Sequence, residues 1–170
     1  MCLILLVNFR NIPAVSIIIS IISLSLLGML GFMGWIYNFT KSDIFYFTLN
    51  HVSMPIVLLT IANSDGVHIV GRFFKELRKL KNSEKAIKET MDHLVLPITL
   101  TTITTSLAFL TLIFSPLTGM NGYGIVLAFG IFWAWFLSLT LMPATIALIN
   151  WKINSKAINR KSLLEKSIDK

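Results

Sequence analysis

Long apolar runs are the feature that most constrains the fold of this chain. Hydrophobic residues make up 55% of the sequence and charged residues only 14%, and the mean hydropathy is +0.76. The runs are long enough to cross the hydrocarbon core of a bilayer, which takes about 20 helical residues. A backbone in hydrocarbon must satisfy its own hydrogen bonds, so such runs fold as helices. We therefore predict an all-α, polytopic membrane helix bundle.

The apolar runs divide the chain into spans and connecting segments. Four full spans are predicted, at about 12–37, 48–71, 95–114 and 125–149. The stretch before them, residues 1–11, is too short to span and is interpreted as the truncated end of a further span followed by a loop. Pro97 is expected to lie at the start of the third full span.

Basic residues mark the loops on one side of the membrane. Residues 72–94 contain seven Lys or Arg and four acidic residues, and the tail 150–170 contains six and two. The loops at 38–43 and 115–124 contain one basic residue between them. By the positive-inside rule the basic segments, including the loop in 1–11, are cytoplasmic. The apolar periodicity of 72–94 predicts an amphipathic helical hairpin or bent helix, with Asn82 or Ser83 as a cap.

Several functional classes find no support in the sequence. The net charge of +7 is explained by topology, so nucleic acid is not an expected partner. A single cysteine, Cys2, cannot form an internal disulfide or a cysteine-based zinc site, and the three histidines are far apart. No metal and no cofactor is expected. No pair of carboxylates and no Ser–His or Cys–His arrangement indicates an enzyme.

Asp65 is the exceptional residue of the membrane spans. It is the only Asp, Glu, Lys or Arg between Asp43 and Arg72. A carboxylate within hydrocarbon is costly, and such a residue is a functional-site hypothesis by default. A purely structural role for Asp65 is the alternative.

Other polar residues accompany Asp65 on the same predicted helix. At 100° per residue, an arc of about 200° contains the supporting residue Asn63 together with Thr60, Ser64, Asp65 and His68. His68 lies one turn towards the cytoplasm, where it could relay a proton or simply hydrogen-bond to Asp65. The third full span offers possible partners, and we nominate the hydroxyls of Thr101, Thr102 and Thr105.

Glycines in two spans predict close helix packing. Small residues let helices approach each other in lipid, although glycine is also simply common in membrane helices. The candidate positions are Gly28, Gly31, Gly34, Gly124 and Gly130.

Five blocks of sequence, in order, resemble the membrane domain of the RND superfamily, in its MMPL-like branch of predicted exporters. The blocks are LLVNFRNIPA with the later LLGMLGFMGW, SDGVHIVGRFFKEL, EKAIKETMDHLVLPITLTTITTSLAFLTLIFSP, NGYGIVLAFGIF and SLTLMPATIAL. They cover nearly the whole chain. The likeness implies the end of the second helix through the sixth helix of one half of such a transporter, the C-terminal half being favoured by the free tail.

The resemblance also implies a mechanism. Members of this superfamily have two similar halves of six helices, and acidic residues in the fourth helix of each half relay protons. Asp65 falls in that helix. The family often has Asp-Tyr or two adjacent acids at this site, and alignment on His68 and Arg72 places Ser64 at the first position and Asp65 at the second. Which of the two positions matches the relay acid is left open.

Two functional hypotheses follow. The chain could be a component or fragment of a proton-driven exporter of hydrophobic or amphiphilic molecules, in a bacterial or archaeal cytoplasmic (inner) membrane. Its partners would then be membrane lipids and a missing partner half or chain, with a homo-oligomer possible. Alternatively, it is a non-transporting membrane module or remnant that binds lipid or another membrane protein. Whether the chain is complete, a split subunit or a truncated remnant is left open, as is the substrate.

Overall fold

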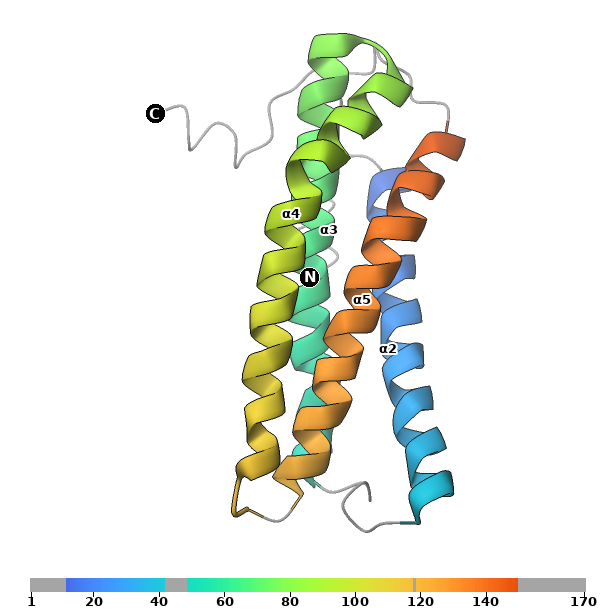
Figure 1. Ribbon diagram of the computed structural model, residues 1–170. Helices are drawn as coiled ribbons and strands as arrows, with labels where there is room; N and C mark the ends of the chain where they lie inside the picture. The colour runs from blue at the N-terminus through green and yellow to red at the C-terminus, as the bar shows by residue number, and fades with distance from the viewer. Residues whose placement is uncertain (1–11, 42–48, 118, 150–170) are drawn as a thin grey trace.

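Four long helices form the described part of the protein. The computed structural model describes residues 12–41, 49–117 and 119–149. The helices run side by side along a common direction, as Figure 1 shows. In chain order the elements are α2 (Ile12–Thr40), the 3₁₀ turn η2 (Leu49–Ser53), α3 (Met54–Leu80), α4 (Ser83–Leu110), the 3₁₀ turn η3 (Thr111–Phe114) and α5 (Met120–Leu148).

These helices confirm the predicted fold class. Each of the four is long and apolar enough to cross a membrane, and the described residues contain no β-strand. The predicted partial span in 1–11 and the basic tail 150–170 lie outside the described residues.

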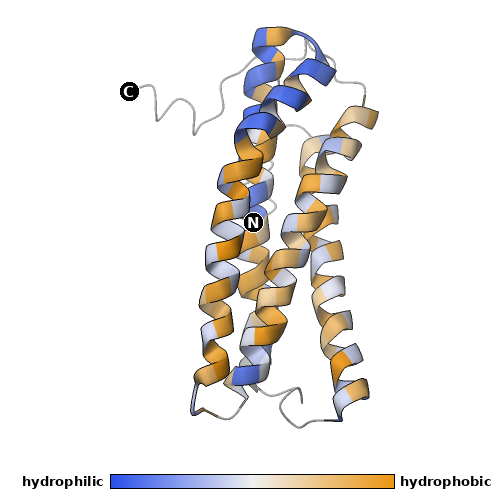
Figure 2. Ribbon diagram, viewed as in Figure 1, coloured by the Kyte–Doolittle hydropathy of each residue, from blue (hydrophilic) through white to orange (hydrophobic). Residues whose placement is uncertain are grey.

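The basic segment 72–94 is a hairpin made from the ends of two spans. Its first part continues α3 to Leu80, and its second part begins α4 at Ser83. Hydrophilic residues gather at this turn, as Figure 2 shows. The segment is thus a helical hairpin, one of the two predicted forms. Its two arms are continuous with the helices of the second and third predicted spans.

Two residues make the turn of this hairpin. Lys81 adopts a left-handed conformation with φ of 50°, and its N–H donates to the carbonyl of Leu77 at 3.0 Å. The side chain of Asn82 then accepts a hydrogen bond from the backbone N–H of Lys85 at 3.1 Å. Asn82 is a preferred residue at a helix N-cap because its oxygen satisfies an otherwise unpaired backbone donor. Asn82 is one of the two predicted caps, and the helix that it begins is 28 residues long.

The buried carboxylate of Glu76 is paired with two basic residues near the C-terminal end of α3. The Glu76 side chain is only 5% exposed, and its Oε1 lies 3.2 Å from Arg72 Nε and 3.3 Å from Lys79 Nζ. Burial of a carboxylate requires such partners, since an unpaired buried charge is strongly destabilising. Arg72 is therefore already engaged within its own helix.

Helix α5 packs against α2, α3 and α4, and three glycines allow close approach. A Cβ added at Gly28 would lie within 3.0 Å of the Trp133 ring, one at Gly130 within 3.0 Å of Met29, and one at Gly124 within 3.0 Å of the Phe109 carbonyl. An added Cβ at Gly31 or Gly34 meets nothing within 4 Å. Gly31 and Gly34 are exposed on α2, so no described residue packs against them, and their role in helix packing stays a prediction.

The bundle is tied together at the end opposite the hairpin. Ser53 and Tyr123 share a hydrogen bond of 3.1 Å between their hydroxyls. The Asn121 side chain donates to the carbonyl of Ile113 at 2.8 Å. These contacts connect η2 and η3 to the start of α5, and they fix the positions of these three elements relative to one another.

Candidate functional site

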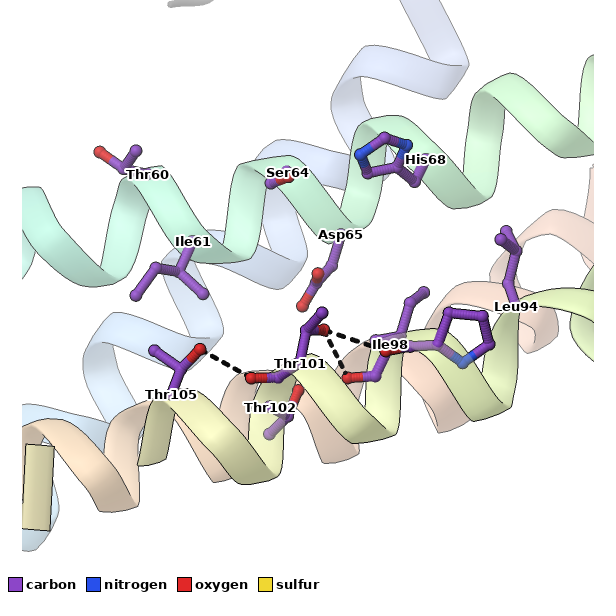
Figure 3. Close-up of a pocket in the computed structure, with 11 residues that line it drawn as sticks. Thr60, Ile61, Ser64, Asp65, His68, Leu94, Ile98, Thr101, Thr102 and Thr105 are labelled. Carbon is purple, nitrogen blue, oxygen red and sulfur yellow. Dashed lines mark hydrogen bonds between the residues drawn. The ribbon is translucent and has the colours of Figure 1, made fainter. Parts of the chain in front are cut away.

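A cavity of about 460 Å³ lies between α3 and α4. Figure 3 shows the residues that line it. Helix α3 contributes the more polar wall and α4 a wall of apolar and threonine side chains. The lining residues are Thr60, Ile61, Ser64, Asp65, His68, Leu94, Pro97, Ile98, Thr101, Thr102 and Thr105.

Asp65 is the one carboxylate on the cavity wall. In Figure 3 its side chain points from α3 towards Thr101 and Thr102 on α4. It is half-buried, and none of the described residues makes a hydrogen bond or ion pair with its carboxylate. Arg72 lies roughly 10 Å further along the helix axis and is paired with Glu76. Within the described residues, therefore, no basic side chain is paired with the carboxylate of Asp65, and the cavity leaves space beside it.

The structure brings the three nominated threonines to the same cavity as Asp65. Thr102 is buried, with an exposed fraction of 4%. The Thr101 hydroxyl donates to the carbonyls of Ile98 at 2.9 Å and Pro97 at 3.2 Å. The Thr105 hydroxyl donates to the carbonyl of Thr101 at 2.7 Å. Each of these hydroxyl oxygens keeps lone pairs that can accept a further hydrogen bond.

The other polar residues of α3 lie at the flank of the cavity. Ser64 and His68 line it but are exposed in this chain. Thr60 is also exposed, and its hydroxyl donates to the Ile56 carbonyl at 2.9 Å. Within the described residues no hydrogen bond joins His68 to Asp65. The polar arc of α3 is therefore partly turned away from the other three helices.

Asn63 is the predicted supporting residue that does not line the cavity. It is half-buried on another side of α3, and its side-chain oxygen is enclosed without a hydrogen bond to any described residue. The 100° step between neighbouring helical residues separates it from Ser64 and Asp65.

Pro97 adds a residue to the site. It lies inside α4, because this helix begins at Ser83 in the hairpin and continues through the predicted span. Pro97 and the neighbouring Leu94 and Ile98 line the cavity but were not predicted as site residues. Their spacing from Thr101 and Thr105 follows one face of a helix, and this signal could have identified them.

Trp135 and Ser106 fix α4 against α5 behind the cavity. The Trp135 ring N–H donates to the Thr99 hydroxyl at 3.0 Å, and the Ser106 hydroxyl donates to the Ala128 carbonyl at 3.5 Å. Hydroxyls and ring N–H groups of membrane helices commonly hydrogen-bond across helices in this way. The threonine wall is thus held in place from the side opposite Asp65.

A comparison with protein families decides the class of this membrane bundle. The sequence model of the MMPL family matches residues 1–163. The chain belongs to the MMPL family. The resemblance predicted from the five sequence blocks is thereby confirmed.

Two curated relatives match parts of this MMPL-family chain. MJ1562 of Methanocaldococcus jannaschii, which is classed as a membrane protein, is 34% identical over 92 residues, or 54% of this chain. The hopanoid transporter HpnN of Rhodopseudomonas palustris (strain TIE-1) is 23% identical over 99 residues, or 58% of this chain. The matched regions cover only 24% and 11% of the two relatives. The chain therefore spans a small part of the length of the curated relatives that it matches.

Proposed function

We propose that the chain is the membrane-embedded part of a proton-driven exporter, with Asp65 as the relay acid. The observation that carries the proposal is the position of Asp65. It is a lone carboxylate on the wall of a cavity between two membrane helices, facing threonine hydroxyls. Desolvation in such a place favours the protonated form of a carboxyl group, and water favours the charged form. Opening and closing of the cavity would therefore couple protonation to conformation.

His68 and Ser64 extend the proposed relay. His68 lies about one turn nearer the α3–α4 hairpin, which we assign to the cytoplasmic side on the basis of its seven basic residues. An imidazole ring can both accept and donate a proton, so we propose that His68 passes protons between the cavity and the cytoplasm. Ser64 supplies a hydroxyl at the flank of the same cavity.

The polar arc of α3 indicates a missing protein surface. Thr60, Ser64 and His68 are exposed in the isolated chain, although they lie within the membrane-spanning part of α3. Polar residues within a membrane face other protein or water and not lipid. We propose that a partner half or partner chain covers this arc and completes the transport pathway.

The substrate class is proposed from the hopanoid transporter relative. A hopanoid is a hydrophobic lipid, and the relative shares 23% identity with this chain over 99 residues. We propose export of hydrophobic or amphiphilic molecules across a bacterial or archaeal cytoplasmic membrane. The basic tail and hairpin would lie on the cytoplasmic side.

The test is transport by the complete assembly carrying Asp65→Asn. This substitution keeps the size of the side chain but removes its ability to bind and release a proton. We therefore expect proton-driven efflux to be abolished. Asp92→Asn is the matched control, because Asp92 is an exposed acid on the hairpin. Equal amounts of both variants in the membrane fraction would show that insertion is intact.

The result also separates the proposal from its alternative. A membrane module that only binds lipid or a partner protein would tolerate neutralisation of Asp65. Efflux that persists unchanged in Asp65→Asn would therefore refute the relay and favour the non-transporting module.

A further inference from the structure

We propose that the end of α3 at the α3–α4 hairpin binds anionic phospholipid headgroups through a basic face of the helix. The inference concerns a surface outside the Asp65 cavity and does not depend on the proposed relay. It is carried by the charge on this end of α3, by the lack of acidic partners for its exposed lysines and by its depth relative to the membrane span.

The excess positive charge of the hairpin lies on one of its two arms. Residues 72–81, at the end of α3, contain five Lys or Arg and one acid, whereas residues 83–94 of α4 contain two and three. Both arms lie at the hydrophilic end of the bundle, as Figure 2 shows. The two arms therefore offer surfaces of different charge at the same end of the protein.

The basic residues of α3 share one face of the helix. At 100° per residue, the four that lie within α3 fall in an arc of about 120°, and Phe73 and Leu77 are buried on the opposite side. All four are exposed or half-buried. An anionic surface on that side would meet several cations of one helix at once. The basic face of α3 is defined by Arg72, Lys75, Arg78 and Lys79.

The one acid in residues 72–81 is already paired. Glu76 is buried, and its carboxylate contacts Arg72 and Lys79. The ammonium groups of Lys75 and Lys81 make no hydrogen bond or ion pair within the described residues. A single carboxylate cannot neutralise five cations, so this end of α3 keeps positive charge for an anion outside the described chain.

The depth of the basic face favours lipid headgroups as that anion. The predicted span ends at residue 71, and at about 1.5 Å per residue Lys75 lies about 6 Å beyond it. The headgroup layer on each side of a bilayer is about 5–8 Å thick. Because α3 continues without a break from the span into the hairpin, Lys75 lies within that layer. A lysine further along can extend its ammonium group back towards the same phosphates.

The expected lipid is an acidic phospholipid. Clusters of basic residues directly beyond the cytoplasmic end of a membrane helix bind anionic headgroups, which give the cytoplasmic leaflet its negative surface potential. The hairpin is assigned to this side by its positive charge. Phosphatidylglycerol, which has one net negative charge, is a suitable probe. Phosphatidylcholine is the matched zwitterionic lipid, because its phosphate is compensated by a cation in the same headgroup.

The experiment measures thermal unfolding of the full chain, purified in a nonionic detergent with the subunits that stay associated. Dioctanoyl phosphatidylglycerol or dioctanoyl phosphatidylcholine is added, and tryptophan fluorescence reports Tm. A ligand of the folded state raises Tm in a saturable manner. We expect this rise with phosphatidylglycerol and not with phosphatidylcholine. Added KCl should increase the half-maximal lipid concentration, because salt screens the attraction between charges.

Substitution of Lys75 tests the basic face. Lys75→Gln should raise the half-maximal concentration about fivefold, and its combination with Lys81→Gln about 25-fold, since each lysine contributes separately to binding of an anionic surface. Lys75→Arg keeps the charge and should behave as the wild type. Without lipid, Lys75→Gln should unfold at the wild-type Tm, because Lys75 is exposed and makes no ion pair within the described residues.

Lys88→Gln is the matched control. Lys75 and Lys88 are both exposed and lie at equal distances from the 81–82 turn. Glu84 and Asp92 flank Lys88 by one helical turn on either side, so its replacement should change the half-maximal concentration by less than about twofold. An equal effect of Lys75→Gln and Lys88→Gln, or equal Tm rises with the two lipids, would overturn the inference.

The alternative occupant of the basic face is an acidic segment of a partner protein. In that case subunits should dissociate from Lys75→Gln during purification while phosphatidylglycerol leaves the wild-type Tm unchanged, and the lipid inference fails. This outcome is separate from that of the proposed function. A lipid effect that requires Lys75 stands even if efflux is insensitive to Asp65→Asn.

Discussion

The role of a polar side chain in this protein depends on the surface of the helix on which it lies. Asp65 and Asn63 are both polar residues of α3, but one lies on the wall of a cavity and the other is enclosed at another side of the helix. Thr101 and Thr104 make similar hydrogen bonds to their own helix, and only Thr101 borders the cavity. Chemical type alone therefore does not separate site residues from neighbouring ones.

The glycines give a prediction at the same scale. Gly124→Ala should destabilise the bundle by about 1–3 kcal/mol, because the new Cβ would overlap the backbone carbonyl of Phe109. Gly34→Ala should be neutral or slightly stabilising, since nothing lies within 4 Å of its added Cβ. The free energy of unfolding in mixed micelles, titrated with a denaturing detergent, measures both. Equal destabilisation by the two variants would contradict the assigned packing.

Trp135 gives a second residue-scale prediction. Trp135→Phe removes the hydrogen bond of 3.0 Å to Thr99 and should reduce the unfolding free energy by about 0.5–2 kcal/mol. Thr99→Val removes the same bond from the other partner. If the bond is stabilising, the double variant should lose less than the sum of the two single losses. Strict additivity would show that the two groups do not interact.

At the scale of elements, the α3–α4 hairpin sets where α3 ends and where α4 begins. Its turn depends on a left-handed Lys81 and on the Asn82 cap. The helices on either side continue from the membrane into the polar hairpin without interruption, so the position of the turn determines which residues of α3 and α4 lie opposite each other.

The turn can be tested by substitution at its two residues. Asn82→Ala should destabilise the start of α4 by about 1 kcal/mol, and Asn82→Gly by only a few tenths. Lys81→Gly should be stabilising, because glycine adopts positive φ without steric strain. Hydrogen exchange of the backbone amides at 83–86 reports the local change. Equal protection in Asn82→Ala and the wild type would show that the cap does not hold the helix.

At the scale of the whole molecule, the chain presents a membrane bundle with one polar side. Thr60, Ser64 and His68 are exposed on α3, and the chain matches only a fraction of each curated relative. Both observations support the proposal that a partner surface covers α3.

The proposed partner surface can be tested by cross-linking in native membranes. With Cys2 replaced by Ser, Ser64→Cys should react with a membrane-permeant photo-cross-linker and join the chain to a protein. Ile56→Cys on the same helix is a matched exposed position outside the cavity lining. Cross-links only to lipid from Ser64→Cys would contradict a protein partner at the polar arc.

The size of the native product is a further measurement at this scale. An antibody against the tail sequence NRKSLLEKSIDK should detect a band in membranes of the source organism. A band far larger than 19.1 kDa would place the partner surface in the same polypeptide. A band at that mass, with cross-links from Ser64→Cys, would place it in a second chain.

The sequence by itself determined the helical membrane class and drew attention to Asp65. Long apolar runs can fold in lipid only as helices or closed barrels, and a lone acid in such a run stands out because burial of its charge is costly. The order of the sequence blocks was also sufficient to indicate the family, and the family comparison confirms it over residues 1–163.

Only the tertiary structure decided which faces meet. The helical period places Thr60, Ser64 and Asp65 on one broad arc, but the rotation of α3 against α4 turns Asp65 towards Thr101 and leaves Thr60 exposed. The sequence likewise could not separate Gly124 from Gly34, since both are small residues in apolar helices. Rotation and contact of helices depend on the shapes of all neighbouring side chains, and this information is distributed over the whole bundle.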